Sequence, residues 1–306
     1  MKYAAHRPAV SSVVCRGSLS AAAAGPCAET PWTRTAHRCS TVRVPTPTPE
    51  RFRGLARSSP WRWRALAFDL HRRPLHGPAH TVHATVERGV GLHVTMADGE
   101  PRRDPAVRNV AGRVHRGSAG RGAPTVELPY AWELPVEVDA DGFVVRRPAG
   151  GVSDDPVWQD YQFVAMLDPL ELADGSHREP GPVWSADAAP PPALAVHRLD
   201  AAVRHGRETW WAEVSPLEGY SPRCSCCPLL FGRVSEDIEM ASGGPTLRSR
   251  QADLAYATAY LVALDVETGI CVHVEHLDGD HAGRGFSVDI RAVDGNDAAQ
   301  APTLGG

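Results

Sequence analysis

Lysine is almost absent from this chain of 306 residues, because Lys2 is the only one and every other basic side chain is arginine. A GC-rich genome explains such a bias without any selection for guanidinium chemistry. Long apolar runs are missing too: no stretch of about 18 apolar residues occurs, which argues against a membrane-spanning helix. The formal net charge is only −4. The sequence therefore predicts neither a nucleic-acid partner nor a membrane span.

Several catalytic motifs are also absent. The chain has no Gly-Lys-Ser/Thr phosphate loop, no Gly-x-Ser-x-Gly elbow and no His-Glu-x-x-His zinc motif. Their absence favours a non-enzymatic protein. A hydrolytic enzyme stays open as a third hypothesis, because catalytic residues can converge from distant positions without a local motif.

The N-terminal part differs from the rest in composition. Residues 1–70 hold eleven basic and three acidic side chains, a balance of +8 that leaves −12 for the remainder. Residues 1–60 lack periodicity and include a Pro-Thr-Pro-Thr-Pro run at Pro45–Pro49, so we expect a disordered Arg/Pro/Ala-rich leader or a start site placed too early. The folded domain is predicted at 61–295, with a flexible tail at 296–306. No convincing signal peptide is seen, which favours the cytoplasm.

Period-two alternation of apolar side chains dominates the predicted folded domain. In Val90–Met96, for example, four apolar residues alternate with Gly91, His93 and Thr95 and so share one face of a strand. Similar patterns predict further strands at Ala65–Leu70, His80–Arg88, Arg108–Arg116, Ala195–Leu199, Glu208–Val214, Tyr260–Val266, Ile270–Glu275 and Phe286–Val293. A hairpin is predicted from Leu134–Val138 through an Asp-Gly turn to Phe143–Arg147.

One principal helix interrupts this pattern. It is expected to start near Asp155, with Asp154 or Asp155 as the cap and Pro156 at the first helical position, and to end at Asp168-Pro169. A short helix capped by Ser235 is expected over Ser235–Met240. The fold class is therefore α+β, a single antiparallel sheet with one principal helix and long loops. An all-β fold with a minor helix is the close alternative.

Three segments resemble outer-membrane lipoprotein carriers and their actinobacterial relatives. They are Ala165–Leu172, Gly206–Val214 and the strand, Thr-Gly turn and strand of Leu264–Glu275. The resemblance implies a strongly curved, half-barrel-like sheet with helices on its concave face. It also implies an exported, non-catalytic protein that holds a lipid-like ligand or a protein partner. The candidate lining residues are Trp132, Trp158, Phe163, Trp210 and Trp211.

A cysteine cluster, Cys224-Ser-Cys-Cys227, is the most reactive group in the chain. Thiolates bind zinc or copper(I), and a cation such as Arg223 lowers a thiol pKa and favours disulfide exchange. Cys271 on a predicted strand is a candidate fourth sulfur or disulfide partner. A structural disulfide, a metal site and a redox site all stay open. On the same strand, period two places Cys271, His273 and Glu275 on one face.

Overall fold

The computed structural model describes residues 46–97, 114–115, 126–127, 129–148, 156–174 and 192–297. The chain divides into two compact units, Met1–Val44 and Pro45–Gly306, and every described residue belongs to the second. No helix in these ranges is long and apolar enough to cross a membrane.

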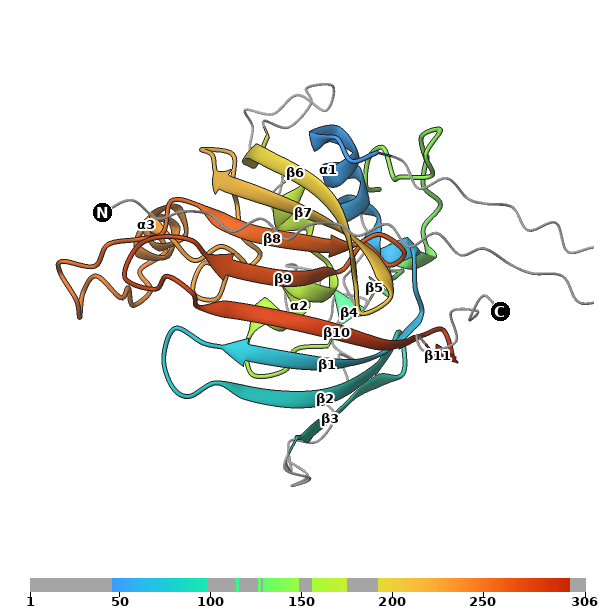
Figure 1. Cartoon of the computed structure of the whole chain (residues 1–306), viewed down its shortest axis with the longest axis horizontal. Helices are drawn as coiled ribbons and strands as arrows, with labels where there is room; N and C mark the ends of the chain where they lie inside the picture. The colour runs from blue at the N-terminus through green and yellow to red at the C-terminus, as the bar shows by residue number, and fades with distance from the viewer. Residues whose placement is uncertain are drawn as a thin grey trace, which may run out of the picture. The chain divides into compact units, whose positions relative to one another are not determined.

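An open antiparallel sheet forms the body of this unit (Figure 1). Its strands lie in the order β3-β2-β1-β10-β9-β8-β7-β6, and all neighbours are antiparallel. The strands are β1 (Ala65–Arg73), β2 (His80–Glu87), β3 (Gly91–Met96), β6 (Leu194–Arg204), β7 (Arg207–Pro216), β8 (Tyr260–Asp265), β9 (Cys271–His276) and β10 (Gly285–Val293). Each overlaps a predicted strand. The α+β class with a curved single sheet is confirmed.

Three short strands lie off this path. β11 (Asn296–Asp297) pairs with the end of β10, so the predicted flexible tail begins inside the sheet. β4 (Val114–His115) pairs only with β5 (Val126–Glu127). The remainder of the strand predicted at Arg108–Arg116 lies outside the described residues.

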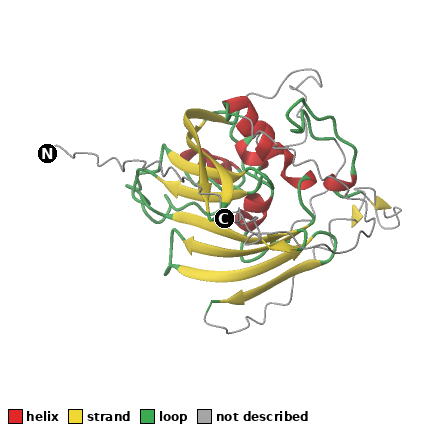
Figure 2. Ribbon diagram, turned by 45° about the vertical axis from the view of Figure 1, so that its right-hand side comes forward, coloured by secondary structure: helices red, strands yellow, loops and turns green. Residues whose placement is uncertain are grey.

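Alternating burial explains the strands. In β2, Val82, Ala84 and Val86 are buried, whereas the residues after each of them are exposed. Val82 lies opposite Leu70 of β1, and Ala84 lies opposite Phe68, so the apolar side chains of the two strands share one face. Full burial of a valine, leucine or phenylalanine side chain contributes roughly 1.5–3 kcal/mol. Figure 2 shows the sheet curving around the helices that cover this face.

The leader was predicted to extend to residue 60, but residues Pro49–Ser58 form helix α1, so the folded domain begins earlier than predicted. Thr48 caps α1, since its side chain accepts from the Arg51 N–H at 3.2 Å. Phe52 and Leu55 are fully buried, and the helix packs against β8. The proline-rich run indicated disorder, but Thr48-Pro49 is also a good helix start and Phe52 and Leu55 recur at helical spacing. A single turn of 3-10 helix, η1 (Ser59–Trp61), follows.

Helix α2 (Tyr161–Leu167) begins later than predicted. Its cap is Asp160, which accepts from the Phe163 N–H, and the predicted caps Asp154 and Asp155 lie outside the described residues. Gln159 has a left-handed φ of 63°, which ends any helix coming from Pro156. The helix stops at Asp168 as predicted, before the 3-10 turn η4 (Leu170–Leu172).

The described part of the chain has a third α-helix, α3 (Arg233–Ala241), where a short helix was predicted over Ser235–Met240. Gly232 is its N-cap in place of the predicted Ser235. The Ser235 hydroxyl accepts from the Gly232 N–H at 3.1 Å and donates to the Gly232 carbonyl at 2.8 Å. The serine thus closes the first turn from inside the helix.

The predicted 134–147 hairpin forms only in part. After a 3-10 turn, η3 (Ala131–Glu133), the two arms meet at an antiparallel bridge between Val138 and Val144, with no longer ladder. The Asp139 N–H donates to the Phe143 carbonyl and the Val145 N–H to the Glu137 carbonyl. The returning segment also bonds to α1: the Val144 N–H donates to the Ser58 hydroxyl at 2.7 Å, and Arg57 donates to the Val144 carbonyl. Alternation shows which face is apolar, but not whether its partner is a strand or a helix.

Candidate metal centre

The cysteine cluster lies in the loop between β7 and α3. The sulfurs of Cys224, Cys226 and Cys227 all lie within 4.8 Å of one another. The Cys224–Cys226 separation is 2.9 Å and the Cys226–Cys227 separation is 3.6 Å. Among the side chains that the structure describes, no other group of three or more potential ligand atoms is so compact. The loop therefore brings three soft donors together.

Glu171 of η4 holds both ends of this loop. Its carboxylate accepts from the backbone N–H of Arg223 and of Leu229, each at 3.0 Å, and from the Tyr220 hydroxyl at 2.7 Å. Arg223 immediately precedes Cys224, and Leu229 follows Cys227 by two positions. Burial raises the pKa of Glu171, while the hydrogen bonds from Tyr220 and the loop oppose that rise. One buried side chain thus closes the loop that carries the sulfurs.

A second buried carboxylate, Asp168, engages the cation beside the cysteines. Arg223 donates to Asp168 at 2.6 Å, and Arg147 donates to it from a different loop. Burial alone raises the pKa of Asp168, but the two guanidinium groups outweigh burial and lower it. Arg223 was predicted to activate a thiol, and instead it forms an ion pair with Asp168.

The thiols of Cys226 and Cys227 are not activated. Burial raises the pKa of Cys227, and the neighbouring Cys224 raises it further. The pKa of Cys226 is raised as well, chiefly by its hydrogen bond with Cys224 and then by burial. The Tyr161 N–H at the start of α2 donates to the Cys227 sulfur at 3.3 Å. Without a metal, Cys226 and Cys227 therefore keep their protons at neutral pH, which disfavours rapid thiol exchange.

Cys271 does not join the cluster, so the predicted fourth sulfur is not supplied by it. A β-bulge pairs Leu264 with Cys271 but Ala263 with His273, so Cys271 and His273 face opposite sides of the sheet. The predicted face of Cys271, His273 and Glu275 is therefore broken. The Cys271 thiol is fully buried, donates to the His273 carbonyl at 3.4 Å, and has its pKa raised to about 12 by burial.

The five predicted aromatic lining residues do not surround one cavity. Trp158 packs edge-on against Phe163 at 5.9 Å, and Phe163 lies 6.0 Å from Phe68 of β1. Trp210 is fully buried against Phe143, whereas its neighbour Trp211 lies beside His273. Trp132 stacks on Tyr130. These side chains fill separate parts of the interior and surface.

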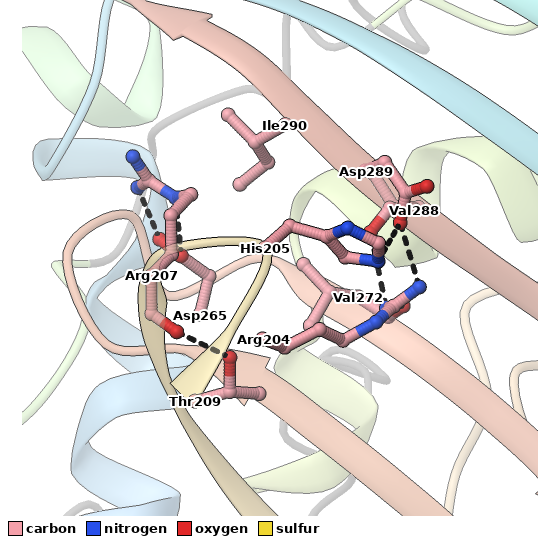
Figure 3. A pocket seen from close by; sticks show the side chains of 9 residues that line it. All are labelled: Arg204, His205, Arg207, Thr209, Asp265, Val272, Val288, Asp289 and Ile290. Carbon is pink, nitrogen blue, oxygen red and sulfur yellow. Dashed lines mark hydrogen bonds and ion pairs between the residues drawn. The ribbon is translucent and has the colours of Figure 1, made fainter. Parts of the chain in front are cut away.

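One pocket lies at the β6–β7 turn, where Arg204 and His205 reach Asp289 of β10 (Figure 3). Arg204 also donates to the carbonyls of Val272 and Val288, and these bonds connect the β6–β7 turn to β9 and β10. The accessible space is about 10 Å³, no more than a single water needs. We regard this group as structural.

No protein-family model, curated protein or solved structure matches the chain. The lipoprotein-carrier resemblance therefore stays a prediction. The sequence singled out the cysteines, but it gave no role to Glu171 and Asp168. The feature that could have identified Glu171 and Asp168 is the presence of two acidic residues inside the otherwise apolar segment Ala165–Leu172. Acids in such a segment are buried and need partners.

Proposed function

We propose that Cys224, Cys226 and Cys227 bind a thiophilic metal ion, copper(I) or zinc(II). The observation that carries the proposal is the convergence of three sulfurs within 4.8 Å on a loop that is fixed at both ends. Soft thiolate ligands select copper(I) and zinc over hard cations such as magnesium. A preformed loop also lowers the entropy lost when the ligands are ordered around an ion.

A structural disulfide explains the cluster less well. A disulfide joins two sulfurs, so a bond within the loop leaves a third thiol beside it. Cys271, the predicted external partner, lies outside the cluster. The raised pKa values of Cys226 and Cys227 also disfavour the redox alternative.

The two ions place different demands on the site. Three thiolates complete a trigonal copper(I) site. Zinc(II) prefers four ligands in a tetrahedron, and three protein ligands leave its fourth position open to water or a small molecule. For either ion the bound form needs thiolates, so metal binding releases protons and the affinity rises with pH.

Metal titration of the reduced full-length protein against a colorimetric chelator tests the proposal. We expect one ion per chain, and an affinity that rises by about tenfold per pH unit for each thiol proton displaced. Each of Cys224→Ser, Cys226→Ser and Cys227→Ser should abolish tight binding. Cys271→Ala is the matched control, since that thiol is buried elsewhere and should leave the stoichiometry unchanged.

Three further cysteines, Cys15, Cys27 and Cys39, lie outside the described residues. A variant in which all three are replaced by serine shows how much of the bound metal belongs to the cysteine loop. Absence of bound metal, or equal binding by the loop variants, would contradict the proposal. A free-thiol count that falls by two in the metal-free protein would instead support a disulfide.

Lipid binding was the leading hypothesis from the sequence. Saturable binding of a fluorescent acyl probe would support it, and would be expected to weaken on Trp210→Ala. The described pockets give it no support, because neither is lined by any of the five predicted aromatic residues.

A further inference from the structure

A cavity of about 170 Å³ lies beside the cysteine cluster, and Cys226 forms part of its wall. The other walls come from α3 and from the loop that follows it. Phe231, Pro245 and Leu247 supply apolar surface. Since a water molecule occupies about 30 Å³ in the liquid, the cavity has room for a molecule the size of an amino acid.

Two side chains of opposite charge line this cavity, Glu239 of α3 and Arg250 of the following loop. One Glu239 oxygen accepts from the Ser225 hydroxyl, which fixes the carboxylate next to the cysteine loop. The Arg250 guanidinium has no hydrogen-bond or ion-pair partner among the described residues. The cavity therefore offers one fixed anion and one free cation.

A third charged residue of the cavity wall, Glu236, is already satisfied. Its carboxylate accepts from the backbone N–H groups of Leu247 and Arg248 and from the Tyr256 hydroxyl. It thereby fixes the loop of Leu247 and Arg250 to α3 and shapes the wall. Recognition of a ligand falls to Glu239 and Arg250.

We propose that this cavity binds a small zwitterionic aminothiol of the cysteine type, whose sulfur supplies the fourth ligand to a metal held by Cys224, Cys226 and Cys227. This inference rests on the proposed metal site. The ligand's ammonium group pairs with Glu239 and its carboxylate with Arg250. Its thiol loses a proton to solvent as the metal–sulfur bond forms, displacing a water from the metal. No electron transfer is involved.

The chemistry of the three-sulfur site explains why the ligand needs a thiol. Zinc(II) bound by three cysteines has an open position in its tetrahedron, and the cavity lies on the Cys226 side of the cluster. A ligand without sulfur has the same charges but no strong bond to the metal. A ligand with sulfur but one charge missing loses one ion pair.

Native mass spectrometry of the reduced, full-length protein tests this inference. The protein is first loaded with zinc(II), and its metal stoichiometry is recorded before any ligand is added. L-cysteine is then titrated in, with a phosphine reductant present to exclude mixed disulfides. We expect a complex of one protein, one zinc and one cysteine. L-serine, which has the same charges and nearly the same size, should be retained at least about tenfold more weakly.

Variants and truncated ligands identify each contact. Arg250→Ala should weaken L-cysteine by about tenfold, the effect of losing one charge-assisted pair, but should leave cysteamine unchanged because cysteamine has no carboxylate. Glu239→Gln should weaken L-cysteine and spare 3-mercaptopropionate, which has no ammonium group. Both variants should still bind one zinc.

The outcomes separate the two proposals. Zinc binding without a cysteine adduct, equal retention of L-serine, or removal of the zinc by L-cysteine would overturn the ligand site and leave the metal site standing. Failure to bind zinc at the first step would overturn both. An adduct that Arg250→Ala and Glu239→Gln do not affect would show that the sulfur binds the metal without the cavity.

Discussion

At the scale of single residues, burial decides the chemistry of the titratable groups. The thiols of Cys226 and Cys227 and the imidazoles of His273 and His276 are all shifted toward their neutral forms. For the thiols this means slow disulfide exchange at neutral pH, and protons that a bound metal ion would have to displace. For the histidines it means a cost in stability under acid conditions.

His276 makes that cost testable. It is 3% exposed, lies edge-on to Tyr260, and its Nδ1 has no hydrogen-bond partner. Burial, and to a smaller extent His281, lower its pKa while Asp278 opposes the shift, and together they leave it at about 4. Below the ordinary pKa of about 6.5 the unfolded chain binds a proton that the folded chain does not. Lowering the pH from about 6.5 to 4 should therefore destabilise the fold.

The expected slope is about 1.4 kcal/mol per pH unit from His276, and a similar amount from His273, whose pKa is also about 4. Urea unfolding at about pH 7 and pH 5 measures it. His276→Gln should remove its share of the acid loss. An unchanged slope in the His276 variant would refute the assignment.

At the scale of elements, the sequence predicted the strands better than it predicted the bulges between them and the contacts of the loops. The two-residue alternation of apolar side chains locates β2 and β10, because each strand buries one face. That alternation is a property of the strand's own residues. The bulge between Cys271 and His273 has no such signal, because it is defined by pairing with β8. The cysteine loop was likewise located from the sequence. Its fixation by Glu171 was not, because the donors are backbone groups of a distant segment.

The Glu171 contacts give an element-scale prediction. Glu171→Gln keeps the size of the side chain but replaces one accepting oxygen with an NH2 group, which then faces a donor. We expect a loss of about 2 kcal/mol in the free energy of unfolding, the cost of an unsatisfied buried donor. Metal affinity should fall with it, because the loop ends are released. Thermal melting and metal titration measure the two effects.

Glu218→Gln is the control for this change, since Glu218 is exposed in the same inter-element loop. It should alter neither quantity measurably. Normal metal affinity in a destabilised Glu171→Gln protein would show that the sulfurs converge without the hydrogen bonds of Glu171 to the loop.

At the scale of the folded unit, the curved open sheet was predictable, but its N-terminal boundary was not. The alternating strands indicated an antiparallel sheet, and the family resemblance added curvature and a helix-covered face. Helix α1 was missed because composition alone indicated disorder up to residue 60. Its formation depends on long-range packing, with Phe52 and Leu55 buried in the domain interior and Gly54 close against Phe143.

This boundary yields the last prediction. A chain of residues 46–306 keeps α1 and every described contact, so its melting temperature should match that of the full chain. A chain of residues 61–306 loses α1. Truncating a single buried phenylalanine costs about 3–5 kcal/mol, and whole domains are stable by only about 5–15 kcal/mol. Removing Phe52, Leu55 and Ala56 together should therefore prevent cooperative folding.

Circular dichroism melting of the two truncated chains, beside the full chain, decides the matter. Arg51→Ala in the full chain is a useful companion, because it removes an exposed ion pair with Asp141 and leaves the buried side of α1 intact. Its loss should be within about 1 kcal/mol. Cooperative melting of residues 61–306 at the full-chain temperature would show that α1 covers the domain without stabilising it. Because α1 packs against β8 and also against η4, whose Glu171 holds the cysteine loop, loss of α1 should weaken metal binding together with the fold.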